Sequence, residues 1–334
     1  MIRSHMERVR MPTIDAVMRA PIAMAYWLGL DAKRTSENGE DVIFLYHGSP
    51  PAVAAELERQ LRYLQRLFTI VPLAALVAAQ GVRRPSGQRR RAALIFDDGL
   101  RSNVLVAHPM LRTLGIPATF FVCPGLIEER RWIWTHEARR RLQFADARLR
   151  AELARELDSP AGVEPFVQWM KGLDLQARTR AELRLREATP AFVPTDADRE
   201  AFDLADWHEL RALDRSIMTI GSHSMTHAIL PRLSAAEIEA ELRDSRQILE
   251  AKLGLPVEFF SYPDDEADGR TNIAVRQYYR AAIVHGSGTL LDPYLLPSMH
   301  LPRGVLRLAC KLNRQAAAQA RSAGALLGSG TPAA

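Results

Sequence analysis

Short apolar runs alternate with longer helix-like segments along much of this chain, and this alternation limits the fold more than any other feature. Residues 42–46, 92–96 and 118–122 are short and almost wholly apolar, while residues 52–67 and 104–114 have helical periodicity. Strands that are apolar on both faces and alternate with amphipathic helices are typical of a parallel sheet covered by helices. The sequence therefore predicts an α/β fold built from βα units.

The same rhythm returns after a long interruption. Residues 218–221 and 257–262 are predicted strands on either side of a predicted helix at residues 234–253. Between residues 128 and 206 the chain is charge-rich, favours helix and is punctuated by prolines. We expect an N-terminal extension (1–41), one catalytic domain (42–308) with a helical insertion (128–206), and a C-terminal tail (309–334).

Composition and charge exclude several classes of protein. With 47% hydrophobic and 25% charged residues, the chain resembles an ordinary globular protein rather than a disordered or fibrous one. The net charge of +5 is small and both signs are interspersed, so we expect no nucleic-acid partner. Cys123 and Cys310 stand far apart, so neither a disulfide framework nor a cysteine zinc site is expected.

The N-terminal region contains one apolar segment at residues 20–30. It is about half the length needed to span a bilayer, and Asp15, Arg19 and the missing small-residue cleavage site argue against a signal peptide. Together with the sparse cysteines this favours a cytoplasmic location, with contact between the segment and a membrane surface left open. The sequence does not indicate an oligomeric state.

Polar side chains follow three of the predicted strands at the point where each ends. Asp97 and Asp98 follow one strand, His223 and His227 another, and residues 262–265 a third. In parallel sheets and barrels, functional groups gather at the carboxyl ends of the strands. Two histidines and one carboxylate form an established zinc ligand set that leaves a position open for water. Asp98, His223 and His227 therefore predict a hydrolytic metal site.

The spacing within these motifs suggests how they act. His223 and His227 stand four residues apart, so a helical turn would aim both imidazoles at one ion. Adjacent carboxylates on an extended strand point in opposite directions, which leaves Asp97 free as a general base. Each motif alone has an ordinary interpretation: a turn for Asp-Asp-Gly, a surface pair for the histidines, and a strand end for Tyr262-Pro263.

The combined pattern resembles polysaccharide deacetylases of the NodB-homology type. Phe96-Asp97-Asp98-Gly99 resembles the first motif of that family, His223-Ser-Met-Thr-His227 resembles the second, and residues 118–122 are also similar. The resemblance covers residues 42–122 and about 206–305. It implies a distorted (β/α) barrel of about seven strands.

The resemblance also implies an activity and assigns residue roles. The chain would be a metal-dependent hydrolase that removes the acetyl group from an N-acetylated sugar, with Asp97 as base and Asp98, His223 and His227 as ligands. We expect zinc first, with cobalt, nickel and manganese as alternatives. The substrate could be a glycan, a lipid-linked intermediate or a small glycoside. A carbohydrate-binding pseudoenzyme and a hydrolase of another linear amide or ester stay open as alternatives.

The third family motif is altered in this chain. Its usual Arg, which pairs with the base, is replaced by Ser261, and its aromatic residue and Gly are replaced by Asp264 and Asp265. The backbone N–H of Asp264 can still serve the oxyanion, while the two added carboxylates should raise the local negative charge and the pKa of Asp97. Arg303, in a Leu-Pro-Arg element, either reaches Asp97 instead or lies on the surface.

The proton donor for the leaving amine is not fixed by a clean motif. His300, His285 and His47 are candidates, and His300 is preferred because it lies nearest the expected last motif. In the insertion, Trp132 and Trp134 either stack on sugar rings or pack between helices.

Overall fold

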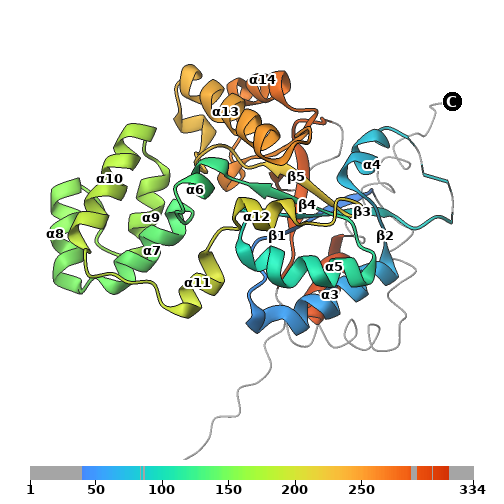
Figure 1. Ribbon diagram of the computed structural model, residues 1–334, viewed down its shortest axis with the longest axis horizontal. Coiled ribbons are helices and arrows are strands. Elements are labelled where there is room, and N and C mark those ends of the chain that lie inside the picture. Colours follow the sequence, from blue (N-terminus) through green and yellow to red (C-terminus); the bar gives the residue numbers. More distant parts are fainter. Residues whose placement is uncertain (1–39, 83, 86, 287–291, 303, 316–334) are drawn as a thin grey trace, which may run out of the picture.

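The computed structural model describes residues 40–82, 84, 85, 87–286, 292–302 and 304–315. Within these residues seven parallel strands close into a barrel, which confirms the predicted fold (Figure 1). In spatial order they are β1 (Val42–Tyr46), β3 (Arg91–Phe96), β4 (Ala118–Val122), β5 (Met218–Ser222), β6 (Phe259–Ser261), β7 (Ala281–His285) and β8 (Leu296–His300), which returns to β1. A short strand, β2 (Thr69–Ile70), pairs with the start of β3.

The barrel is unevenly paired. Strands β4 and β5 match along their whole length, from Ala118 opposite Met218 to Val122 opposite Ser222. Strands β5 and β6 are paired at one position only, where Ser222 lies opposite Phe260. The seam between β5 and β6 is therefore the least paired part of the barrel, and it lies next to the second and third motifs.

Alternate side chains of each strand enter two different cores. Ile43, Ile95, Phe121 and Phe259 belong to a buried cluster that also includes Leu73 of α4 (Leu73–Ala78). Successive strand residues face opposite sides, so this cluster fills the barrel interior. Because α4 precedes β3, it lies toward the amino ends of the strands. The opposite, carboxyl end of the barrel is left for the functional site.

The other strand face packs against the surrounding helices. These are α3 (Ala54–Leu67), α5 (His108–Leu114), α12 (Trp207–Arg211), α13 (Ala235–Leu253) and α14 (Gly269–Tyr278). The longest, α13, begins with a capping box between Ser234 and Glu237 and ends at Gly254 in the left-handed region. Residues 305–315 are also helical and bury Leu308 and Leu312. The boundary expected at residue 308 thus falls inside this helix.

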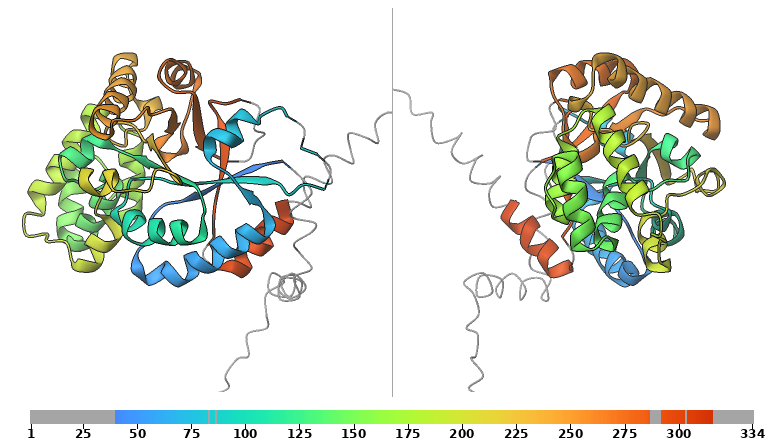
Figure 2. Two further views of the ribbon diagram at one scale, coloured as in Figure 1. Left: turned by 45° about the vertical axis from the view of Figure 1, so that its right-hand side comes forward. Right: turned by 90° about the vertical axis from the view of Figure 1, so that its left-hand side faces the viewer.

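The insertion between β4 and β5 is helical, as expected. It comprises α6 (Pro124–Glu128), α7 (Trp134–Phe144), α8 (Ala147–Leu157), α9 (Val163–Lys171), α10 (Leu175–Ala188) and α11 (Asp196–Phe202). Helices α7 to α10 form a lobe at one side of the barrel, with their own core that includes Phe166 and Met170 (Figures 1 and 2). Ile229, from the loop after β5, is buried in the same core. The insertion is therefore packed directly onto a loop of the predicted site.

The apolar segment at residues 20–30 lies outside the described residues. Among the residues that are described, no helix has both the length and the apolar character needed to cross a bilayer.

A substitution at Gly221 of β5 tests the packing of the barrel interior. A side-chain carbon added there would overlap the Phe121 ring and lie 3.0 Å from the carbonyl oxygen of Phe259. Gly221→Ala should therefore lower the free energy of unfolding by about 1–3 kcal/mol, measured by urea denaturation.

Gly269→Ala is the matched control, because a methyl group at Gly269 would have no neighbour within 4 Å. It should leave stability unchanged or raise it by about 0.4–1 kcal/mol. Equal stabilities of the two variants would contradict the described packing.

Candidate active site

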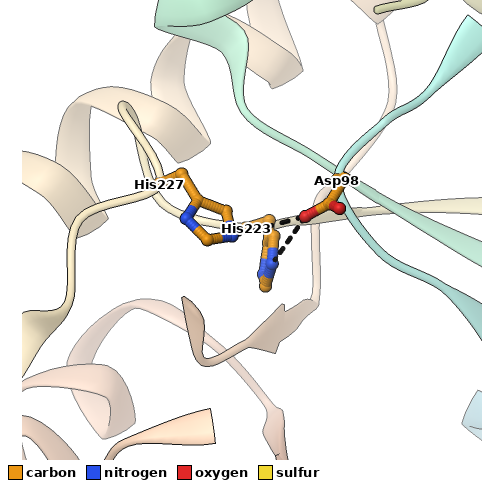
Figure 3. A group of neighbouring side chains, drawn as sticks. All are labelled: Asp98, His223 and His227. Atoms are coloured by element: carbon orange, nitrogen blue, oxygen red, sulfur yellow. Dashed lines mark ion pairs between the residues drawn. The ribbon is translucent and has the colours of Figure 1, made fainter. Parts of the chain in front are cut away.

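Asp98, His223 and His227 converge at the carboxyl end of the barrel. The Asp98 Oδ1 atom lies 3.3 Å from Nε2 of His227 and 3.7 Å from Nε2 of His223 (Figure 3). All three side chains are buried, and one potential ligand atom from each lies within 4.8 Å of the others. The structure thus brings together the three residues predicted from the sequence as a metal set.

The path of the chain from His223 to His227 differs from the sequence prediction. The two histidines were expected on one helical turn, but this segment is a loop in which Ser224 and His227 have positive φ values of 62° and 55°. The carboxylate of Glu241 on α13 accepts hydrogen bonds from the backbone N–H groups of Met225 and Thr226 and from the Thr226 hydroxyl. These bonds stabilise the bent loop. The predicted helical turn was therefore wrong, although the two histidines do converge on Asp98 as the sequence predicted.

A hydrogen bond sets the tautomer of His223. Its Nδ1 atom lies 2.7 Å from the carbonyl oxygen of Ser261, which can only accept, so Nδ1 carries the proton and Nε2 presents its lone pair toward Asp98. Burial, with a further contribution from His227, lowers the pKa of His223 to about 3. His223 is therefore a neutral imidazole, the form that binds metals.

Asp98 is ionised in this setting. Burial by itself would raise its pKa, but hydrogen bonds with His136 and His227 outweigh burial and hold the pKa well below its usual range. In the ion pairs of the described residues, the partners of Asp98 are imidazoles and not Lys or Arg. A buried carboxylate beside two imidazole rings is a donor set that fits a divalent cation.

Asp97 is buried next to the metal set and keeps one oxygen free. Its Oδ2 atom accepts a 3.0 Å hydrogen bond from the Ser261 hydroxyl, while Oδ1 is buried and has no hydrogen-bond partner. Burial and the charge of Asp98 raise the pKa of Asp97 well above its usual value. Ser261 thus contacts the predicted base from the position where the family has Arg. Arg303 lies outside the described residues, so its proposed contact with Asp97 stays a prediction.

The altered third motif forms a turn, η4 (Pro263–Asp265), in which Asp264 and Asp265 have φ values of 56° and 61°. The side chain of Asp264 is ion-paired with Lys171, at the end of α9 in the insertion. One of the two added carboxylates is therefore matched by a cation from the insertion. The role of the Asp264 backbone N–H toward an oxyanion stays a prediction.

The three histidines considered as proton donors lie together. The rings of His47 and His300 stack with centroids 4.8 Å apart, and the His285 ring is 4.1 Å from that of His300. Nε2 of His300 lies 3.7 Å from Oδ2 of Asp265. His47 and His300 line a cleft of about 230 Å³ that Asp97 and Asp98 also line.

The insertion supplies two contacts to the metal set that the sequence did not predict. Nε2 of His136, in the first turn of α7, lies 3.4 Å from the second oxygen of Asp98. The indole N–H of Trp134 donates a 2.9 Å hydrogen bond to the carbonyl oxygen of His227. No spacing rule connects α7 with residues so distant in the chain. In the sequence, the one feature that drew attention to this region was the pair of tryptophans in an Arg-rich stretch.

Trp132 and Trp134 are packing residues rather than exposed platforms for sugar. Trp134 is 1% exposed and Trp132 is 8% exposed. The indole N–H of Trp132 donates to the carboxylate of Asp203 at 2.7 Å. Of the two alternatives for these side chains, the structure supports packing between helices.

Comparisons with known proteins agree with the fold and identify the family. Residues 84–282 match the family described as polysaccharide deacetylase. A deacetylase, PplD, of Streptococcus pyogenes, solved in complex with acetate, is similar in structure at 14% identity, with a TM-score of 0.54 over 82% of this chain and 98% of that one. IcaB of Ammonifex degensii is similar at 14% identity, with a TM-score of 0.52 over 83% of this chain and 98% of that one.

The polysaccharide deacetylase BC0361 of Bacillus cereus is similar at 15% identity, with a TM-score of 0.50 over 83% of this chain and 69% of that one. At such identities these structures bear on the fold alone. No curated protein sequence matches the chain.

Trp134→Phe tests whether the insertion positions a metal ligand. The variant keeps an aromatic ring but leaves the His227 carbonyl without its donor, which should cost about 1–3 kcal/mol of stability. Because His227 then loses its support, affinity for zinc should fall roughly 10–100-fold, measured by titration calorimetry of the metal-free protein.

Trp132→Phe is the control, since it removes a comparable indole hydrogen bond that touches no residue of the metal set. It should lower stability without weakening zinc binding. Equal zinc affinities of the two variants would argue against a positioning role for Trp134.

Proposed function

Because the chain belongs to the polysaccharide deacetylase family, we propose that it is a metal-dependent hydrolase that removes the N-acetyl group from an N-acetylated sugar. The observation that carries the proposal is the convergence of Asp98, His223 and His227 beside the buried, half-free carboxyl group of Asp97. A divalent ion held by the three residues would polarise the acetamide carbonyl and lower the pKa of a water molecule. Zinc is the first choice for this donor set.

Asp97 is the proposed base, and Ser261 holds it in place. The Ser261 hydroxyl holds one oxygen of Asp97, which leaves Oδ1 to accept the proton of the attacking water. The water oxygen then bonds to the carbonyl carbon and forms an oxyanion. The Asp264 backbone N–H donates to that oxyanion, which lowers the energy of the transition state.

His300 is the proposed proton donor to the leaving amine. It lines the cleft, and it has a carboxylate partner, Asp265, that orients the ring. Transfer of the proton accompanies cleavage of the C–N bond and yields acetate and a free amino sugar. His285 contacts His300 but is not among the residues that line the cleft. This arrangement favours His300 over His285.

Acetate release from a panel of N-acetylated sugars tests the activity. The natural sequence should release acetate, and a chelator should abolish the release. Asp97→Asn should lower kcat by about 10²–10⁴-fold and still bind zinc, because it removes the base but no ligand. His223→Ala should lose both zinc and activity, whereas His208→Ala, at an exposed histidine, should lose neither.

Release that is insensitive to chelator and to both site variants would exclude this mechanism. Binding of zinc and sugar without turnover of any substrate would favour the pseudoenzyme, and turnover of other amides or esters alone would favour a different hydrolase.

Ser261→Ala tests the partner of the base. Loss of the hydroxyl removes a hydrogen bond that lowers the pKa of Asp97, so the pKa should rise. A base must be deprotonated to act, so the acidic limb of the kcat/KM profile should move to higher pH. Ser261→Thr retains a hydroxyl and should restore the natural profile. Identical acidic limbs for the Ala variant and the natural sequence would contradict the role given to Ser261.

A further inference from the structure

We propose that Asp265, His285 and His300 form a second divalent-cation site at the rim of the same cleft, distinct from the site of Asp98, His223 and His227. The three residues lie at the ends of β7 and β8 and in the turn after β6, so consecutive strands of the barrel present them at one edge. One potential ligand atom from each lies within 4.8 Å of the others. The ligand atoms of the first set lie within the same distance of one another.

The donor chemistry of the second set equals that of the first. Each set contains two imidazoles and one carboxylate, a combination that zinc, cobalt and nickel accept. The distance from Asp265 Oδ2 to His300 Nε2 is 3.7 Å, which equals the distance between Asp98 and His223. The rings of His285 and His300 approach to 4.1 Å between centroids without stacking face to face, at an interplanar angle of 62°.

The charges at this edge of the barrel favour a cation. Four aspartates line the cleft, Asp97, Asp98, Asp264 and Asp265, and neither Lys nor Arg is among the described residues of its lining. The cation that pairs with Asp264 is Lys171, whereas the ion-pair partner of Asp265 within the described residues is His300. A divalent ion on Asp265 would neutralise charge that the imidazoles compensate only when they are protonated.

The protonation states fit a ligand set. Burial would raise the pKa of Asp265, but His300 and His285 outweigh it and keep this carboxyl group ionised. Burial and the neighbouring His300 lower the pKa of His285, which makes it a neutral imidazole, and its Nδ1 atom is buried with no hydrogen-bond partner. Metal ligands of this type must be unprotonated to bind.

Among the described residues, Lys311 opposes binding. Lys311 donates a 2.7 Å hydrogen bond to the backbone carbonyl of His300, and its charge contributes to lowering the pKa of His285. The side chains of Asp265 and His300 are also about one-third exposed, at 34% and 37%, whereas those of the first set are buried. The second site should therefore bind its ion more weakly than the first and exchange it more readily.

Occupancy of the second site would have a functional consequence that rests on the proposed function. His300 cannot give a proton to the leaving amine while its lone pair binds a metal. Excess zinc should therefore inhibit a deacetylase that needs stoichiometric zinc. The second site then acts as an inhibitory cation site.

Zinc titration of the metal-free full chain, followed by calorimetry, tests the proposal. The natural sequence should bind one ion tightly and a second at least about 10-fold more weakly. His285→Gln and Asp265→Asn should each abolish the weak step and keep the tight one, while His223→Ala should do the reverse. His208→Ala controls for zinc on exposed histidines and should retain both steps. Thermal unfolding of each metal-free variant verifies that it is folded.

Cobalt absorption spectra add a readout that is independent of turnover. Addition of a second equivalent of cobalt should change the d–d bands of the natural protein and leave those of His285→Gln unchanged. A single binding step in the natural sequence, or a weak step that persists in both His285→Gln and Asp265→Asn, would overturn the second site. Two binding steps without acetate release from any substrate would overturn the proposed function and leave the second site standing.

Discussion

Closure of seven parallel strands into one barrel is the constraint on which the site depends. Asp98 follows β3, His223 follows β5 and Ser261 ends β6, so these residues are far apart in the chain and meet only because the strands run parallel around a closed ring. Ser261 then joins the two functions of the site. Its carbonyl oxygen fixes the tautomer of His223, and its hydroxyl holds Asp97. One residue of a three-residue strand thus orients both a candidate ligand and the candidate base.

The sequence predicts the elements whose pattern is local. Strands β1, β3 and β4 are apolar on both faces, and α13 has a capping box and a terminal glycine, so each can be recognised within its own segment. Strand β8 is harder to recognise because it contains Pro297, which usually argues against a paired strand. The convergence of Asp98, His223 and His227 could also be predicted, because polar residues at the ends of parallel strands meet at one edge.

The remaining features of the site depend on contacts that no local pattern encodes. The loop from His223 to His227 is bent because Glu241 supplies acceptors from another helix. The replacement of Arg by Ser261 could be read from the sequence, but the hydroxyl contact with Asp97 required the structure. The contacts of His136 and Trp134 depend on how the insertion packs onto the barrel, which is a tertiary property. Lys171 reaches Asp264 from the same lobe, so the insertion contacts the site at three places.

Because β5 and β6 are sparsely paired, His223 also helps to join these two strands. The backbone joins these strands at the single pair of Ser222 and Phe260, but the imidazole of His223 adds a hydrogen bond to Ser261 one residue further along each strand. The side chain therefore extends the pairing of β5 and β6 by one hydrogen bond. An ion bound to the other nitrogen of this ring would link this hydrogen bond to β3 through Asp98. Loading of the site with an ion would therefore also tighten the least paired junction of the barrel.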